Sequence, residues 1–164
     1  MVPVPGAGNV TAIAVYGLLD ERSDASVHRS LSDLTPLFED SRYNKRVVLG
    51  GDLNTWTGWD AGSRHFARDE NVLRRIEAFG FVDCLVASLE REGRGRLNGC
   101  TCSLGEACRH TRTRLDRNQP EIPYQMDYLF ASPPLAERLL SCEAIDLGPD
   151  SPSDHFPIRA TFTG

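Results

Sequence analysis

The feature that most constrains this chain is a short apolar segment, VVLGGDLN at residues 47–54, that ends in two glycines, a carboxylate and an amide. Its apolar, β-branched start is typical of a strand that is covered on both faces. Asp52 and Asn54 follow at the carboxyl end of this strand. Such residues can simply form a turn, but open α/β sheets also bind their ligands at the carboxyl ends of strands. The tip of this strand is therefore either a turn or a site, and the rest of the chain has to decide.

Size and composition permit one packed domain, or a fragment of a larger one, because 40% of the 164 residues are hydrophobic and 25% are charged. The formal net charge of −5 means that no basic footprint for nucleic acid covers the whole surface, although a local patch can serve. The chain contains no apolar run of the ~20 residues that a membrane span needs. Its five cysteines are an odd number, which argues against a complete disulfide framework. We therefore expect a reducing compartment and a cytoplasmic location.

Strands and helices mix along the chain, so we expect an α/β or α+β fold. The strands are predicted at residues 10–16, 46–50, 124–131 and 156–162. One helix follows Asp24, a second begins at Asp69 as its N-cap and ends at Gly80, and a short one follows Ser132 as cap. Residues 81–85 could be extended or helical, and residues 90–117 are predicted to be a long loop. Residues 1–9, rich in Pro and Gly, are predicted to be a tail or remnant loop, and residues 10–164 to be a single partial domain.

Chemically capable residues recur at strand ends or inside apolar strands. Besides Asp52, these are Tyr16, Asp127 within YQMDYLF, and the Asp154-His155 pair directly before FPIRATF. A carboxylate inside a strand as apolar as MDYLF is costly unless it is paired or faces a site. His155 could be that partner, since a carboxylate that orients a histidine is a recurring catalytic unit.

Three segments carry a resemblance to a known family. GGDLNTW, YQMDYLFAS and SDHFPIRATF, in this order, resemble signature segments of the endonuclease/exonuclease/phosphatase superfamily, with its deoxyribonuclease I-like and exonuclease III-like members. VTAIAVYG resembles the strand that carries the active-site tyrosine of that superfamily. The resemblance implies part of a four-layer α/β/β/α sandwich, and it covers about the second half of the family domain. The first half, with an early Asn and a metal-binding Glu, cannot be placed upstream of Tyr16.

The resemblance also implies a role for each matching residue. Asp52 would orient or deprotonate the attacking water, Asn54 would hold that water or a phosphate oxygen, and Tyr16 would offer its phenol to the phosphate. A tyrosine at a strand end can also be a core residue with a solvated hydroxyl.

The last two segments would supply the phosphate contact and a metal ligand. His155 would contact the scissile phosphate, with Asp127 behind it as hydrogen-bonded partner, and Asp154 would contribute to a site for Mg²⁺ or Mn²⁺. The implied function is metal-dependent phosphoester hydrolysis by a nuclease or related phosphodiesterase, with nucleic acid as the favoured substrate. Because the metal-binding Glu is not found, the alternative is a truncated, non-catalytic remnant or phosphate-binding domain, and we leave open whether the chain is an enzyme.

The Arg- and Cys-rich segment at residues 98–117 permits two further interpretations. Cys100, Cys102, Cys108 and His110 could bind Zn²⁺ as a Cys₃His set, but the C-x-C spacing is tight, so reduced loop cysteines or a local disulfide are favoured. By its position in the family, the segment places His110, Thr113 and Arg114 near the substrate, with a solvated basic loop as the alternative. A partial sandwich would also leave sheet surface uncovered, and we expect the chain to associate through that surface.

Overall fold

The structure, a computed structural model, describes residues 2–3, 10–18, 23–40, 46–58, 63–95, 97, 100, 102–148 and 150–164. Its main element is a five-stranded sheet in the order β1-β2-β3-β5-β4. Strands β2 and β3 are parallel, and the other neighbours in this sheet are antiparallel. The five strands are Val2–Pro3 (β1), Thr11–Ala14 (β2), Val47–Asp52 (β3), Val82–Asp83 (β4) and Asp127–Ala131 (β5). A second, antiparallel sheet pairs β6 (Leu139–Ala144) with β7 (Ile158–Phe162).

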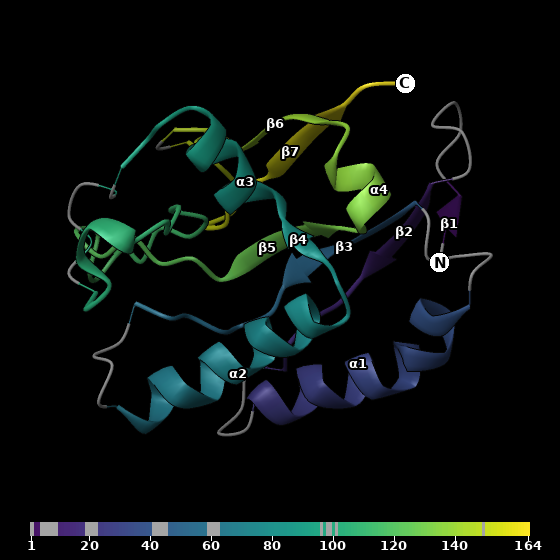
Figure 1. The fold of residues 1–164 in the computed structure, drawn as a ribbon. Coiled ribbons are helices and arrows are strands. Elements are labelled where there is room, and N and C mark those ends of the chain that lie inside the picture. Colours follow the sequence, from purple (N-terminus) through teal and green to yellow (C-terminus); the bar gives the residue numbers. More distant parts are fainter. Residues whose placement is uncertain are drawn as a thin grey trace.

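The two faces of the main sheet are covered by different elements (Figure 1). The long helices α1 (Ser23–Glu39) and α2 (Arg64–Ala78) lie side by side on one face. The β6–β7 sheet lies on the opposite side, together with α3 (Cys84–Arg91) and the short helix α4 (Pro133–Ala136). The mixed α/β class that the sequence predicts is therefore confirmed.

The core is divided by β3, whose residues alternate between two apolar clusters. Val47 and Leu49 are fully buried in the cluster formed with α1 and α2, whereas Val48 packs into the cluster formed with α3, α4 and the second sheet. Because successive side chains of a strand point to opposite faces, a strand that is apolar at consecutive positions has to be covered on both sides. This is the arrangement that the apolar run before Asp52 predicts.

The predicted N-cap of α2 is wrong. Ser63 caps this helix by accepting hydrogen bonds from the backbone N–H groups of His65 and Phe66. Asp69 lies six residues after this cap, buried within the helix, and its Oδ2 accepts a hydrogen bond from the backbone N–H of Trp56 at 3.0 Å. Asp is a common cap, but here its acceptor capacity is used by a distant loop, which a local pattern cannot show.

Other boundaries also differ from expectation. The undecided residues 81–85 are both extended and helical, because β4 ends at Asp83 and Asp83 then caps α3. The predicted strand at residues 124–131 is regular only from Asp127, and Tyr124 forms an isolated bridge with Arg114. Strand β6 was not predicted, and the predicted loop contains the end of α3 and a 3₁₀ turn, η1 (Gly105–Ala107). Ser132 precedes α4 as expected, but its hydroxyl accepts from Val47 N–H.

Among the helices that the structure describes, none is both long enough and apolar enough to span a membrane.

Candidate active site

The candidate site lies where β3 ends and β5 begins. These strands are antiparallel, and their register places Asp52 directly opposite Asp127. Side chains of such a pair lie on the same face of the sheet, where two like charges destabilise the pairing. His155 faces both carboxylates, because its Nδ1 lies 2.8 Å from Asp127 Oδ2 and its Nε2 lies 4.0 Å from Asp52 Oδ2. Three residues that the sequence singled out thus converge from three separate segments.

The pKa of the Asp52 carboxyl is raised above its ordinary value. Burial is the main cause, and the Asp127 carboxylate adds to it. The backbone N–H of Asn54, the His155 ring and the Arg114 guanidinium act in the opposite direction. Asp52 is therefore more basic than an ordinary aspartate and is surrounded by hydrogen-bond donors and cationic groups, which suits a group that accepts a proton from water.

Asn54 fixes the geometry of the strand tip. Its backbone is left-handed, with φ of 49°, a conformation that Asn tolerates better than most residues. Its N–H donates to Asp52 Oδ1 at 2.9 Å, and its side-chain Nδ2 donates to Gly17 O at 2.7 Å and to Asp52 Oδ2 at 3.2 Å. The Asp52 carboxylate is thus held by its own neighbour, and the tip is tied to the end of β2.

The hydrogen bond from Asn54 Nδ2 to Gly17 O also brings the segment after β2 to the site. Gly17 N–H donates to Asp52 O, and a Cβ at Gly17 would lie only 2.1 Å from Leu53 O. Tyr16 directly precedes this close approach and is 59% exposed. It is therefore not a core residue: its ring projects into solvent at the end of the sheet where Asp52 lies.

Asp154 and Arg114 form an ion pair beside the site, with Arg114 Nε 3.0 Å from Asp154 Oδ2. The hydrogen bond from Arg114 is the main reason why the pKa of Asp154 is lowered. Arg114 also lowers the pKa of Asp52, so its positive charge acts on the candidate site. An isolated antiparallel β-bridge between the backbones of Arg114 and His155 holds Arg114 in place.

Thr113 is fully buried and organises the two strands around it. Its hydroxyl oxygen accepts the N–H groups of Met126 and Asp127 at 2.9 and 3.0 Å, and its carbonyl accepts Phe156 N–H at 2.7 Å. These bonds position the residues directly beside His155 and at the start of β5. The side chain of Thr113 thus has a clear positioning role and no exposed surface for a substrate.

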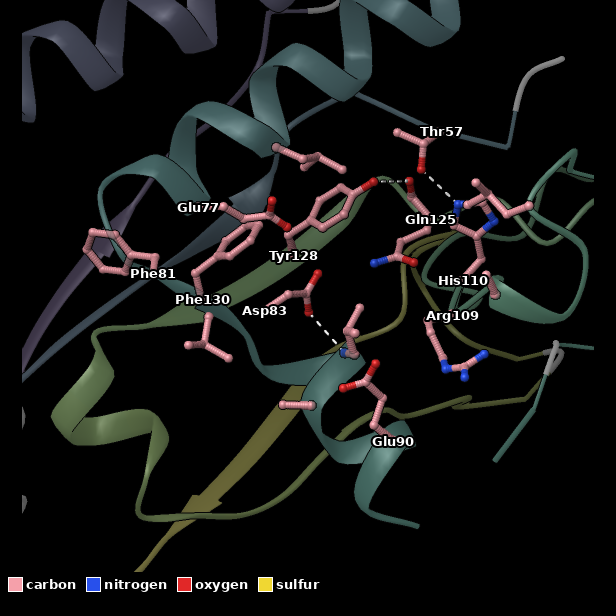
Figure 2. A pocket seen from close by; sticks show the side chains of 16 residues that line it. Thr57, Glu77, Phe81, Asp83, Glu90, Arg109, His110, Gln125, Tyr128 and Phe130 are labelled. Atoms are coloured by element: carbon pink, nitrogen blue, oxygen red, sulfur yellow. Dashed lines mark hydrogen bonds between the residues drawn. The ribbon is translucent and has the colours of Figure 1, made fainter. Parts of the chain in front are cut away.

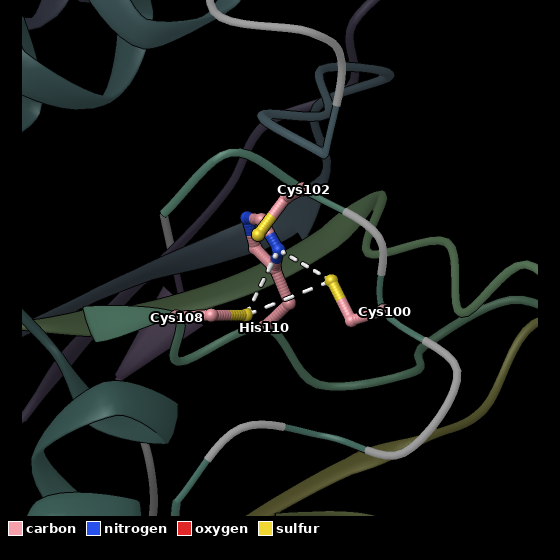
Figure 3. A group of neighbouring side chains, drawn as sticks. All are labelled: Cys100, Cys102, Cys108 and His110. Atoms are coloured by element: carbon pink, nitrogen blue, oxygen red, sulfur yellow. Dashed lines mark hydrogen bonds between the residues drawn. The ribbon is translucent and has the colours of Figure 1, made fainter. Parts of the chain in front are cut away.

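His110 lies elsewhere, among the three cysteines of its loop (Figure 3). It is buried, its Nδ1 faces the thiols of Cys100 and Cys108, and its Nε2 is 2.8 Å from the hydroxyl of Thr57. His110 is therefore not one of the proposed substrate contacts. None of the five cysteines, all of which lie in the described part of the chain, forms a disulfide, so the local disulfide that the sequence left open is not formed in the structure.

The loop after the strand tip is held by two residues that the sequence analysis did not select as functional. Asp69 accepts Trp56 N–H, and the Tyr128 hydroxyl donates to Thr55 O at 3.1 Å. A signal for Asp69 was present, because it lies on the same helical face as Val72 and the buried Ile76, where a carboxylate needs a partner.

A cavity of about 530 Å³ lies between α2, β4, α3 and the Cys-rich loop (Figure 2). Its lining includes the carboxylates of Glu77, Asp83 and Glu90, with Arg109 as the cation. These acids would repel a phosphate, and the lining contains neither Asp52 nor His155. We therefore place the candidate site at the strand tips and not in this cavity.

The donors at the strand tips have the chemistry that a hard divalent cation requires. Asp52, Asp127 and His155 each offer a ligand atom within 4.8 Å of the others. Asp154, which directly precedes His155 in the sequence, adds a further carboxylate. Carboxylate oxygens suit Mg²⁺, which also retains water molecules. All three carboxylates already have hydrogen-bond partners: Asn54 for Asp52, His155 for Asp127 and Arg114 for Asp154. A carboxylate nevertheless has lone pairs for a further partner. The set therefore fits partial coordination of such an ion.

No family model matches the sequence, and no curated protein matches it. Solved structures do match. An AP endonuclease from Archaeoglobus fulgidus has a TM-score of 0.60 at 22% identity and covers 92% of this chain. A 3′-5′ exonuclease from Neisseria meningitidis gives 0.56 at 22% identity over 93%, and a Neisseria 3′ phosphatase bound to a product DNA hairpin gives 0.58 at 20% identity over 94%.

The chain has part of the deoxyribonuclease I-like fold of these structures. This confirms the fold that the three sequence segments imply. The chain spans 60%, 61% and 62% of the lengths of these three structures, so it corresponds to part of the complete domain. The likeness establishes the fold, and the activity of this chain is a separate question.

Proposed function

We propose that this chain is a metal-dependent phosphoester hydrolase, or the part of one that carries the water-activating and phosphate-binding residues, with nucleic acid as substrate. The observation that carries the proposal is the arrangement of Asp127, His155 and Asp52. A carboxylate behind Nδ1 fixes the ring so that Nε2 faces a second carboxylate 4.0 Å away. This distance is too long for a direct hydrogen bond, but a single oxygen atom can bond to both groups.

In this proposal Asp52 orients and deprotonates the water that attacks phosphorus. His155 donates from Nε2 to a phosphate oxygen, and Asp127 holds the ring in the required tautomer. Asn54 keeps the Asp52 carboxylate in place, and Arg114 offsets the negative charge of the substrate. Each of these residues is held in place by hydrogen bonds or an ion pair to its neighbours, which supports the proposed roles.

A divalent cation, Mg²⁺ or Mn²⁺, would stabilise charge on the phosphoryl oxygens. Asp154 is the proposed ligand, with Asp52 as a further oxygen donor. Tyr16, exposed beside the tip, is proposed to contact the phosphate or the adjacent sugar. The nucleic-acid preference is supported by the Neisseria phosphatase, which has the same fold and was solved with DNA.

The test is hydrolysis of an aryl phosphodiester and of DNA bearing an abasic site or a 3′ phosphate by the full chain, with Mg²⁺ and with chelator. Asp52→Asn and His155→Ala should each lower kcat/KM by about 10²- to 10⁴-fold, the range for a positioned base or charge-stabilising donor. Asp33→Asn, the same chemical change on the exposed face of α1, is the matched control and should retain full activity. Turnover that persists unchanged in Asp52→Asn would contradict the proposal.

A second candidate is a non-catalytic domain that binds phosphate ligands. It is favoured by one observation, that the chain spans only about 60% of the first matching structure. A folded chain that binds DNA in a His155-dependent and salt-sensitive manner, but shows no turnover, would support this candidate over the first. Absence of both turnover and binding would refute both.

A further inference from the structure

Three cysteines and one histidine converge in the loop between α3 and β5. The Cys100 and Cys108 sulfurs are 3.6 Å apart, and His110 Nδ1 lies 3.3 Å from the first and 3.4 Å from the second. One ligand atom of each residue, Cys102 included, lies within 4.8 Å of the others, and the four residues are all buried. Figure 3 shows the three sulfurs and the ring gathered around one point.

These distances agree with the edges of a zinc tetrahedron. With Zn–S of about 2.3 Å and Zn–N of about 2.0–2.1 Å, neighbouring ligand atoms in a tetrahedral site are roughly 3.6–3.8 Å apart. The three distances given above fall within a few tenths of an ångström of this range. A disulfide, in contrast, requires sulfurs at about 2.05 Å. These three donors are therefore spaced for a shared ion and not for a covalent bond, and the Cys102 sulfur lies within 4.8 Å of each of them.

The far side of the histidine ring is also organised as in a metal site. His110 Nε2 lies 2.8 Å from the hydroxyl of the buried Thr57. In the tautomer protonated at Nε2, this hydroxyl accepts the ring N–H and Nδ1 offers its lone pair toward the sulfurs. Metal-bound histidines almost always make such an outer hydrogen bond, which fixes the tautomer and the ring orientation.

The surroundings do not resemble an apolar core. The three cysteines form a cluster of their own, with Leu97 as the partly buried apolar residue packed against it, separate from the two main clusters. Among its described residues, the segment contains one 3₁₀ turn as its regular structure. A long loop with so little apolar burial among these residues needs another source of order, and a structural metal would supply it.

We propose that Cys100, Cys102, Cys108 and His110 bind one structural Zn²⁺. Three thiolates and one imidazole are a closed tetrahedral set with no position left for a substrate, so the ion would be structural and not catalytic. The bound ion would fix the loop that leads directly to Thr113 and Arg114, and through Thr57 it would also support the loop after Asp52. That consequence for positioning rests on the proposed function, whereas the metal site itself does not.

The test is metal analysis of the full chain purified from zinc-supplemented medium, followed by replacement with Co²⁺. We expect about one zinc ion per chain and, with Co²⁺, visible absorption typical of a tetrahedral thiolate site. A folded chain without zinc that takes up neither ion, or one that holds iron or copper instead, would overturn the proposal. These readouts do not involve hydrolysis, so failure of the metal site and failure of the proposed function are distinguishable.

Two pairs of variants assign the ligands. Cys108→Ala should lose the stoichiometric zinc, whereas Cys142→Ala, the same change at a buried cysteine of the β6 core, should retain it. His110→Cys keeps four ligands and should retain zinc, whereas His110→Ala should lose or rapidly release it. Wild-type zinc content in both Cys108→Ala and His110→Ala would refute this ligand set. If the alanine variants do not fold, the Co²⁺ spectrum of the wild type still decides the question.

Discussion

Asp83 offers the sharpest test of how burial controls charge in this protein. Its Oδ1 accepts hydrogen bonds from Leu85 N–H at 2.8 Å and from Val86 N–H at 3.2 Å, which makes it the N-cap of α3. Burial nevertheless raises the pKa of Asp83 from 3.8 to about 6, and the nearby Glu77 adds to the effect. The two N–H donors lower the pKa but do not compensate for burial.

The sign of the pH dependence follows from the direction of this shift. Between about pH 4 and pH 6 the folded protein binds the Asp83 proton more tightly than the unfolded chain does, so this group makes the free energy of unfolding fall as pH rises. A displacement of about two pKa units corresponds to about 3 kcal/mol. At neutral pH the charged Asp83 cap therefore stabilises the folded state less than a neutral cap of the same shape would.

The perturbation is Asp83→Asn, which keeps the capping oxygen, since Asn and Asp are equivalent caps. Urea unfolding of the wild type and the variant should be measured from about pH 3 to about pH 7.5, a range that brackets both pKa values. The difference in unfolding free energy should move in favour of Asp83→Asn by about 3 kcal/mol across this range. Asp33→Asn, at an exposed position of α1, should show no such trend.

A pH-independent difference between Asp83→Asn and the wild type would refute the reasoning, because it would mean that the Asp83 carboxyl titrates alike in the folded and unfolded states. A difference that moves in favour of the wild type with rising pH would show that the helix N-terminus dominates over burial.

Three further predictions concern the strand tip, its supporting residues and the outer surface. Tyr128→Phe removes the hydroxyl that donates to Thr55 O and should lower the free energy of unfolding by about 1–2 kcal/mol, measured by urea unfolding. Gly51→Ala should cost about 2 kcal/mol or more and lower any Mg²⁺-dependent turnover, because φ is +140° and a Cβ would lie 2.2 Å from Val15 O; a fully stable, active variant would show that the strands can separate there without loss. The chain should associate with rising concentration, as followed by light scattering, and Leu140→Lys, at a 55% exposed position of β6, should weaken this association; a monodisperse monomer would contradict it.

Local sequence patterns predicted much of this fold, because the order of apolar and polar residues along a strand or helix shows which of its faces are buried. The run before Asp52 is apolar at consecutive positions, and β3 is indeed covered on both faces. The Ser132-Pro133 pair begins a helix as predicted. The Asp69 prediction failed for a related reason: a helix cap is a local feature, whereas the partner of Asp69 is the backbone of Trp56 on another segment.

What the sequence determined about this protein is the identity and order of the chemically capable residues at the ends of its strands. Only the tertiary structure decided which of them meet. The register of β3 against β5 places Asp52 opposite Asp127, and the packing of the Cys-rich loop brings a C-x-C pair and His110 within ligand distance of one another. Both outcomes depend on contacts between residues that are far apart in the chain or are joined by loop backbone. Spacing along the sequence does not determine such contacts, because loop backbone can bring the same residues together or keep them apart.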